Sequence, residues 1–496
     1  MIKNILANFI GRFWGIFSNF LFIPLYIYFL GIRGYSIISF SLVLAGIMGI
    51  LDAGLTATLS KEFASKSNDI ETKKKVFITL ESCYLIITIV IIFLFLLFSN
   101  TIAIKWLNIE SVSSAIISNY LRIIGIGLAF QLLTNFYIGG FYGLELQIKA
   151  NVYQVIFGII RNGLVVLPLL YTPSLYWFFC WQTSSTIIYT LLLRHSLKNT
   201  IFKNEIISFF RIDKSILKKV WKFAGGILLI ALVAAVNTQM DKLAISKLLP
   251  IEKLGYYTLA ISLSQGLIIL ITPIATAVLP RFTSLFSENK IKEVTDLYQR
   301  IFLVSSIIVF SFAANMILNA ESLIWIWTGN KQFAIEAGQF VPYLATGMLM
   351  LSLQYIPYNV ALANGYTRLN NYLGIISLIV TLPGYWIMTK QFGPIGAAIV
   401  WGFVQSIITP IYLYYINKKF LQKIVFSKIL TMNILLPGML AFIIAYACFS
   451  VKYFQEQRWG MFFWIGFSTI LTLFVLIFSF IGKFELSKAY NYIIKK

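Results

Sequence analysis

The chain contains 496 residues, of which 59% are hydrophobic and 12% are charged, and its mean hydropathy is +0.83. Water-soluble domains are typically about half apolar and about a quarter charged, so a soluble globular fold is excluded. The 40 Lys and Arg residues outnumber the 18 Asp and Glu residues without forming a compact basic domain, and we therefore expect no nucleic-acid binding.

Apolar runs of about 20 residues, long enough to cross about 30 Å of hydrocarbon, recur along the whole chain. Charged or turn-rich breaks divide the chain into about fourteen predicted transmembrane helices, at residues 8–30, 35–59, 76–98, 112–138, 149–170, 174–194, 221–246, 254–280, 298–320, 334–357, 369–389, 394–416, 430–450 and 458–481. The first run lacks a small-residue cleavage site and leads directly into further spans, so we expect a membrane helix and not a removable signal peptide.

Lysine and arginine are distributed unevenly between the loops on the two sides of the membrane. If the N-terminus is cytoplasmic, the cytoplasmic segments contain 28 of these residues and the opposite segments contain 8. Cytoplasmic loops of membrane proteins are enriched in Lys and Arg. The asymmetry therefore predicts an even number of spans with both termini in the cytoplasm.

Residues that often carry metal or nucleophilic chemistry are scarce in this sequence. Cys83, Cys180 and Cys448 lie inside or at the edge of apolar runs without metal-like spacing, and we interpret them as packing residues. The single histidine, His195, lies at the basic end of a span, where an interfacial side chain is expected. The sequence predicts no catalytic residue, metal ion or cofactor.

The chain matches itself at an offset of 219 to 221 residues. The matching pairs are Gly34-Tyr35 with Gly255-Tyr256, Lys149-Ala150-Asn151-Val152-Tyr153 with Arg368-Leu369-Asn370-Asn371-Tyr372, and Trp181 with Trp401. Any two amphipathic spans flanked by basic loops look somewhat alike, but several matches at one offset favour a true repeat. Since six helices separate matched positions, the two repeats are expected to be parallel.

These patterns predict an all-α polytopic membrane protein built from two parallel six-helix pseudo-repeats and two further C-terminal helices. The predicted boundaries are a first six-helix bundle at residues 1–194, a basic cytoplasmic linker at 195–220, a second bundle at 221–416, and the extra helices with a cytoplasmic tail at 417–496. Duplicated bundles that move against each other around a central site are typical of alternating-access carriers.

Four basic residues lie inside predicted spans: Arg12, Arg122, Arg161 and Lys242. Each costs roughly 2.5–3.5 kcal/mol at a helix centre unless it faces protein, water or an opposite charge. They either line a cationic cavity for an anionic substrate or form structural ion pairs with the acids Asp52, Glu81, Glu145 and Asp241. Arginine suits a phosphate ligand because its planar guanidinium donates two parallel hydrogen bonds.

Several motifs resemble those of the multidrug/oligosaccharidyl-lipid/polysaccharide exporter superfamily, and within it the Wzx-type O-antigen and polysaccharide flippases. The motifs are Leu51-Asp52-Ala53-Gly54-Leu55 followed by Lys61, then Asp241, Gly255-Tyr256-Tyr257 and Leu279-Pro280-Arg281. The resemblance extends over nearly the whole chain and implies that each six-helix half is a MATE-like bundle.

The resemblance also implies a function in the bacterial inner membrane. A Wzx-type flippase moves an undecaprenyl-diphosphate-linked oligosaccharide from the cytoplasmic to the periplasmic leaflet, and its expected partners are membrane lipid and the polymerase and chain-length proteins of the same pathway. A proton or sodium gradient coupled through Asp52, Glu145 or Asp241 is expected to drive transport. Two alternatives stay open: a multidrug exporter of the same superfamily, and a membrane enzyme that polymerises or ligates glycans.

Overall fold

The computed structural model describes the backbone of residues 2–52, 54–65, 69–109, 112–202, 210–421, 426–451 and 457–494. The side chains of residues 2–13, 15–17, 19, 219–230 and 481–494 lie outside this description. The described residues are almost entirely helical, and no strand occurs among them apart from one isolated bridge between Asn108 and Pro250. The prediction of an all-α protein is therefore confirmed.

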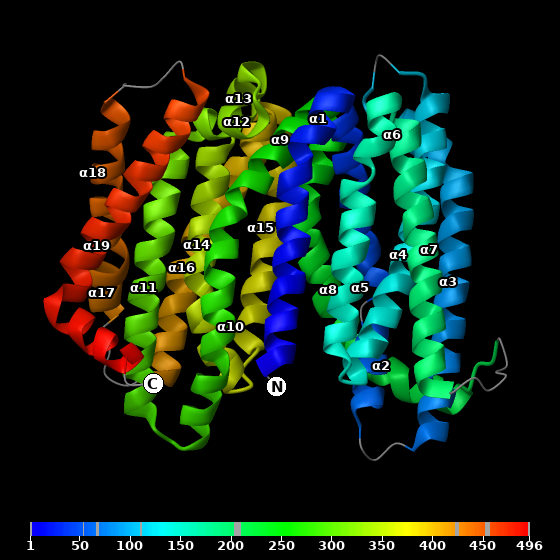
Figure 1. The fold of residues 1–496 in the computed structure, drawn as a ribbon, viewed down its shortest axis with the longest axis horizontal. Coiled ribbons are helices and arrows are strands. Elements are labelled where there is room, and N and C mark those ends of the chain that lie inside the picture. Colours follow the sequence, from blue (N-terminus) through cyan, green and yellow to red (C-terminus); the bar gives the residue numbers. More distant parts are fainter. Residues whose placement is uncertain are drawn as a thin grey trace. The chain divides into compact units, whose positions relative to one another are not determined.

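The chain divides into two compact units, at residues 1–255 and 256–496. The helices of the first unit are α1 (Ile2–Asp52), α2 (Leu55–Ala64), α3 (Ile70–Lys105), α4 (Ser114–Gly143), α5 (Gln147–Gly158), the π-helix η1 (Ile159–Gly163), α6 (Val166–Tyr171), α7 (Leu175–Phe202) and α8 (Lys214–Leu248). The long helices run side by side in Figure 1, where α4 packs against α3, α7 and α2. The boundary between the units lies after α8, whereas the predicted linker at 195–220 lies mostly before it. Helix α8 belongs to the first unit because it packs against α1.

Helix α9 (Ile251–Ser264) begins in the first unit and continues into the second. The second unit contains α10 (Gly266–Ser287), α11 (Ile291–Leu318), α12 (Ala320–Thr328), α13 (Lys331–Gly338), α14 (Val341–Ala363), α15 (Arg368–Phe392), α16 (Pro394–Phe420), α17 (Phe426–Ile429), the π-helix η2 (Leu430–Leu435), α18 (Leu436–Ser450) and α19 (Arg458–Ile494). Within this unit α14 packs against α16, α10 and α11, and α11 also contacts α18 and α19.

The helices repeat along the chain at the spacing that the sequence predicts. Helices α3 and α11 begin at residues 70 and 291, α5 and α15 begin at 147 and 368, and α7 and α16 begin at 175 and 394, which are 221, 221 and 219 residues apart. The packing repeats as well: α4 contacts α3 and α7, and α14 contacts their counterparts α11 and α16. The domain boundaries that we drew from the repeat remain predictions.

Ten helical stretches of the described chain are long and apolar enough to cross a membrane. The count becomes fourteen, as predicted, when α7, α8 and α14 are added and α1 is divided at Gly31, whose φ of 68° and ψ of 176° interrupt the helix. The second predicted span, 35–59, is also interrupted, because α1 ends at Asp52 and α2 begins at Leu55. Between them, Gly54 adopts the left-handed φ of 97°.

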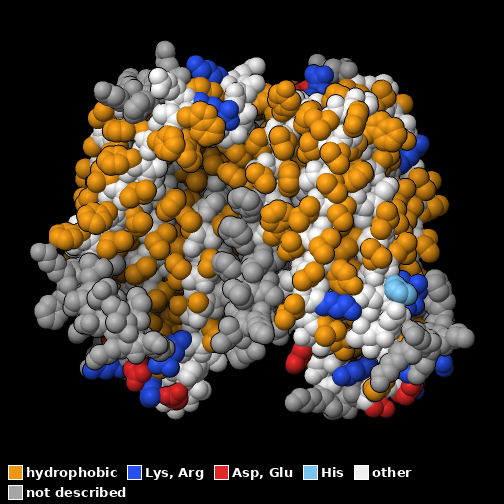
Figure 2. Space-filling view, viewed as in Figure 1, with side chains coloured by type: hydrophobic (Ala, Val, Ile, Leu, Met, Phe, Trp, Pro, Cys, Tyr) orange, Lys and Arg blue, Asp and Glu red, His pale blue; other side chains and the backbone are white. Residues whose placement is uncertain are grey.

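Hydrophobic side chains form a band on the visible face of each unit, whereas charged side chains gather toward the helix ends (Figure 2). On α3, the exposed side chains of Ile89, Phe93 and Leu97 recur every four residues and therefore share one side of the helix. An apolar surface of this kind is stable against lipid and unstable in water.

Helix α8 begins with a capping residue in the loop between α7 and α8. The side chain of Asp213 accepts hydrogen bonds from the Ser215 hydroxyl and from the backbone N–H groups of Ser215 and Ile216. These bonds, with the Ser215 hydroxyl as the largest contribution, lower the pKa of the Asp213 carboxyl from its ordinary value. The cap fixes the start of α8 because it satisfies backbone donors that have no partner inside the helix.

Candidate functional site

The fifth predicted span changes from α-helix to π-helix near its middle, at η1. The backbone N–H of Leu164 donates to the carbonyl of Ile159 over 3.0 Å, five residues back and not four. This extra residue in the turn displaces neighbouring carbonyls from their usual intrahelical donors. Short π-helical turns often occur at functional sites, and this one contains the predicted site residue Arg161.

Three side chains from α7 and α1 donate to three successive carbonyls of this turn: Trp181 Nε1 to Ile160 (2.9 Å), Gln182 Nε2 to Arg161 (3.0 Å), and the Tyr26 hydroxyl to Asn162 (2.6 Å). In a lipid environment each unsatisfied backbone group costs several kcal/mol. Polar side chains at these places in α1 and α7 therefore stabilise η1, and they fix its position between the two helices.

The described contacts of the Arg161 side chain are with uncharged groups. Its Nη1 donates to Gln131 Oε1 on α4 over 3.4 Å, and its guanidinium carbon lies 5.8 Å from the centre of the Phe157 ring. Its Nε is shielded from solvent without a hydrogen-bond partner among the described residues. No ion pair in the described part of the chain includes Arg161, so its positive charge is not neutralised there.

Lys242 on α8 lies in a different environment. Its Nζ is 3.8 Å from Oδ1 of the buried Asp241, donates to the carbonyl of Thr238, and is 3.4 Å from Gln239 Oε1. The ion-pair alternative from the sequence therefore describes Lys242 better than it describes Arg161. A neutralised ammonium of this kind has less attraction for an anion than a free one.

Asp52 ends α1 and holds a small group of hydroxyls. Its Oδ1 accepts hydrogen bonds from Thr56 on α2 and from the fully buried Tyr84 on α3, and these two hydroxyls are 2.8 Å apart. None of the ion pairs found among the described residues includes Asp52. The carboxyl group thus joins three helices through uncharged hydroxyl donors. Because these donors carry no charge, the protonation state of Asp52 sets the charge of the group.

A buried charge cluster of the first unit surrounds Glu81, whose side chain is 2% exposed. Arg194 Nε lies 2.8 Å from Oε1 and Lys198 Nζ lies 3.2 Å from Oε2, while the Tyr137 hydroxyl donates to Oε1 over 2.8 Å. The sequence predicts instead that Glu81, if paired, is a partner of Arg12, Arg122, Arg161 or Lys242. The four-residue spacing of Arg194 and Lys198 on one helix face is the signal that could have identified this cluster.

Two family models match the chain. The model described as "Polysaccharide biosynthesis protein" matches residues 1–286, more than half of the chain, and the model described as "MatE" matches residues 227–387. The chain belongs to the polysaccharide biosynthesis protein family. The predicted resemblance to the exporter superfamily is confirmed.

Relatives of this polysaccharide biosynthesis protein agree with that assignment. A Shigella flexneri protein named "Putative O-antigen transporter" is 22% identical over 372 residues, which cover 75% of this chain and 87% of the relative. The lipid II flippase MurJ, solved in an inward closed conformation, is similar with a TM-score of 0.74 and 15% identity, over 97% of this chain and 99% of that chain.

A multidrug resistance MATE family transporter of the MOP superfamily, solved in an inward-facing conformation, is also similar. Its TM-score is 0.68 at 13% identity, over 84% of this chain and 98% of that chain. At such low identity the two structures establish the fold alone. This member of the polysaccharide biosynthesis protein family therefore has the fold of MurJ and MATE transporters, and it is a multi-pass membrane protein.

Two further predicted site residues, Arg122 and Glu145, do not lie beside Arg161. Arg122 on α4 is exposed, and it contacts Ser99 (Nε to Oγ, 3.2 Å) and Asn119 (Nη1 to Oδ1, 3.3 Å). It lies nine residues before Gln131, which is roughly 13 Å along the helix. Glu145 is exposed in the turn between α4 and α5, where its φ is 60°. The side chain of Arg12 lies outside the described residues.

Proposed function

We propose that the chain is a flippase that moves an undecaprenyl-diphosphate-linked oligosaccharide, the repeat unit of an O-antigen or a surface polysaccharide, from the cytoplasmic to the periplasmic leaflet. The observation that carries this proposal is Arg161, a guanidinium near the middle of a span with no opposite charge among the described residues. Such a group attracts a diphosphate because it remains charged after dehydration and can donate two hydrogen bonds.

The relatives support the same proposal. The Shigella flexneri relative is named for O-antigen transport and the MurJ structure for flipping lipid II, so both names refer to glycans carried on lipids. We place the chain in the bacterial inner membrane with both termini in the cytoplasm, because cytoplasmic loops carry the excess of Lys and Arg. Transport by alternating access follows from the repeated six-helix architecture, and on this proposal the chain is a carrier and not an enzyme.

Of the three acids predicted to couple transport to an ion gradient, we assign this role to Asp52. Glu145 is exposed in a turn and Asp241 lies 3.8 Å from Lys242, whereas Asp52 contacts two hydroxyls that can stabilise either protonation state of its carboxyl. A proton or a sodium ion that binds this group would link the transport cycle to the membrane gradient.

The test is replacement of Arg161 in cells that depend on this chain for surface glycan. We expect Arg161→Ala to reduce glycan display at least about tenfold, the effect of losing a charged hydrogen-bond donor, and Arg161→Lys to retain part of it. Arg211→Ala, at an exposed position before α8, is the control and should leave display unchanged. Normal display with Arg161→Ala, at wild-type protein levels in the membrane, would contradict the proposed role.

Export of cationic drugs is the second candidate, because the MatE model matches residues 227–387. A cationic substrate calls for carboxylates and aromatic rings in the binding site, whereas Arg161 places a positive charge inside the first unit. Efflux of a cationic dye from cells that express the chain would favour the exporter, and absence of efflux together with restored glycan display would favour the flippase.

A further inference from the structure

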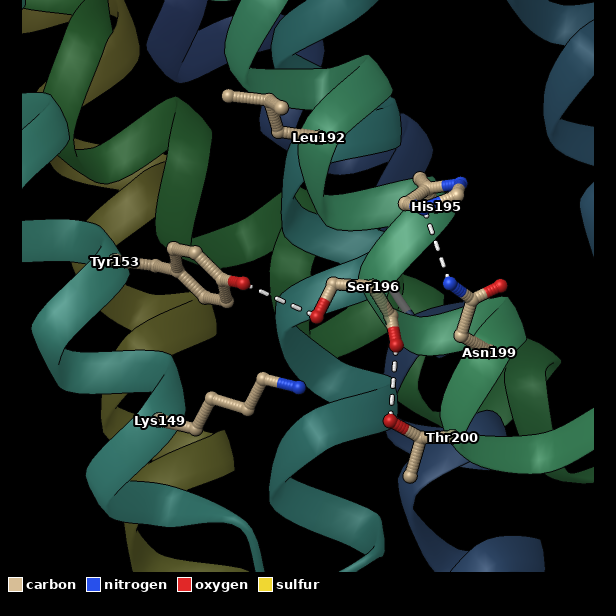
Figure 3. Close-up of a pocket in the computed structure, with 7 residues that line it drawn as sticks. All are labelled: Lys149, Tyr153, Leu192, His195, Ser196, Asn199 and Thr200. Carbon is tan, nitrogen blue, oxygen red and sulfur yellow. Dashed lines mark hydrogen bonds between the residues drawn. The ribbon is translucent and has the colours of Figure 1, made fainter. Parts of the chain in front are cut away.

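A pocket of about 390 Å³ lies between α5 and α7 in the first unit (Figure 3). Its lining residues are Lys149, Tyr153, Leu192, His195, Ser196, Asn199 and Thr200. The volume falls within the range of sites that hold small molecules, about 300–1,000 Å³. The pocket lies at the start of α5 and near the end of α7, which is the predicted cytoplasmic side of the membrane.

The lining is rich in hydrogen-bond donors and contains a cation. Lys149 and Tyr153 extend from α5 toward α7, where the Tyr153 hydroxyl donates to Ser196 Oγ over 3.1 Å (Figure 3). The Lys149 ammonium lies 5.4 Å from the centre of the Phe141 ring, which helps to hold it in place. None of the seven lining residues is acidic, so the pocket favours a negatively charged ligand.

The surface that leads from the pocket toward the middle of the span is apolar and exposed. On α5 the side chains of Val152 and Ile156 are 51% and 50% exposed, and on the antiparallel α7 those of Leu192 and Ile188 are 56% and 59% exposed. Only 11% of the most apolar stretch from Gln147 to Tyr171 is buried. The cationic pocket thus lies at the end of two rows of exposed apolar side chains, one on α5 and one on α7. A phospholipid has the matching chemistry, because its phosphate is joined to apolar chains.

We propose that this pocket binds the phosphate group of a membrane lipid, with the lipid chains along the exposed rows of α5 and α7. Basic pockets between helices on the cytoplasmic side of a membrane commonly bind anionic headgroups. The Lys149 ammonium supplies the charge, and Asn199 has a second amide hydrogen beyond its 3.0 Å bond with His195. The hydroxyls of Tyr153 and Thr200 already donate to Ser196 and complete the polar lining. Arg161 is not among the lining residues, so the site can exist whether or not the chain is a flippase.

Native mass spectrometry of the full-length protein in detergent tests the site. The probes are phosphatidylglycerol and undecaprenyl phosphate as anionic lipids, phosphatidylcholine as a zwitterionic lipid, and inorganic phosphate. We expect wild-type protein to bind at least one of the two anionic lipids more tightly than phosphatidylcholine. The anionic lipid that binds more tightly identifies the source of the phosphate. The double variant Lys149→Gln/His195→Gln should weaken that binding at least about fivefold, which is the loss expected when one cation near the membrane surface is removed.

The control is Lys418→Gln, because Lys418 also lies over an aromatic ring, that of Tyr414 at 5.7 Å, but does not line the pocket. Thr200→Glu, at an exposed position, is a second variant that places a carboxylate in the pocket and should abolish anionic lipid binding. Unchanged lipid affinity in either variant, equal affinity for phosphatidylcholine, or displacement of the lipid by an equal concentration of inorganic phosphate would overturn the proposal.

Discussion

Arg194 on α7 donates through Nε to Oε1 of Glu81 on α3 over 2.8 Å, and this ion pair joins two helices of the first unit. Lys198 approaches the other carboxylate oxygen to 3.2 Å, so two cations share one buried anion. The two basic side chains are 23% and 18% exposed and can still reach water, whereas Glu81 at 2% cannot. The carboxylate is therefore the group on which the cluster depends.

Glu81→Gln should destabilise the protein. The change removes the buried negative charge that Arg194 and Lys198 share. We expect a loss of about 3 kcal/mol, near the lower end of the range for a broken buried pair because both cations reach solvent. The measurement is the midpoint of thermal unfolding of the purified protein in detergent, followed by tryptophan fluorescence.

Glu71→Gln is the matched control on the same helix. Glu71 also pairs with a lysine, Lys74 at 3.3 Å, but its side chain is 67% exposed. Exposed pairs contribute only about 0–1 kcal/mol, so the unfolding midpoint should barely change. Equal shifts for the two variants would show that burial of Glu81 has no effect on the strength of its ion pairs.

Asp52→Asn separates the charge of this residue from its hydrogen bonds. Asparagine keeps a side-chain oxygen that can accept from Thr56 and Tyr84, and we expect stability within about 1 kcal/mol of wild type. If Asp52 couples transport to an ion gradient, the variant should lose gradient-driven translocation of the lipid-linked oligosaccharide in proteoliposomes. Glu145→Gln, at an exposed turn, should keep it. The opposite result would move the coupling role from Asp52 to Glu145.

Gly54→Ala should destabilise the break between α1 and α2. Gly54 has a φ of 97°, a left-handed conformation that costs a residue with a Cβ about 1–2 kcal/mol. Gly49→Ala is the control, since Gly49 lies inside α1 and a Cβ there meets nothing within 4 Å. Alanine is a better helix former than glycine by up to about 1 kcal/mol, so this variant should be neutral or slightly stabilised. Thermal unfolding midpoints that fall together in both variants would contradict the strained turn.

Helix positions could be predicted because the signals for them are local. Runs of apolar residues and the breaks between them lie in the sequence itself. Helices α3, α4 and α11 follow the predicted spans and extend beyond them at one end or both. The predicted span 35–59 passed over the break at Gly54, although Asp52 and Thr56 make this stretch more polar than the rest of the span. The π-helix η1 left no pattern that we could recognise, because it depends on donors from α1 and α7.

The candidate site could be predicted only in part. The sequence singled out Arg161 and Asp52, and both have polar surroundings in the structure. It also grouped Arg122 with Arg161, although the two arginines lie at different heights along the bundle and Arg122 is exposed. Helical spacing tells which residues share a face of one helix, but it does not tell which neighbouring helix that face meets.

By itself the sequence determined a membrane protein of about fourteen helices in two repeats, because a lipid environment forces each apolar span to satisfy its backbone hydrogen bonds internally. The offset of 219 to 221 residues then aligned the helices of the two units. Only the tertiary structure decided which charges are neutralised. Glu81 meets Arg194 across 113 residues of chain, while Arg161 meets neutral groups. Such pairing depends on how each helix is rotated and on which helix lies beside it, and neither is encoded in local sequence.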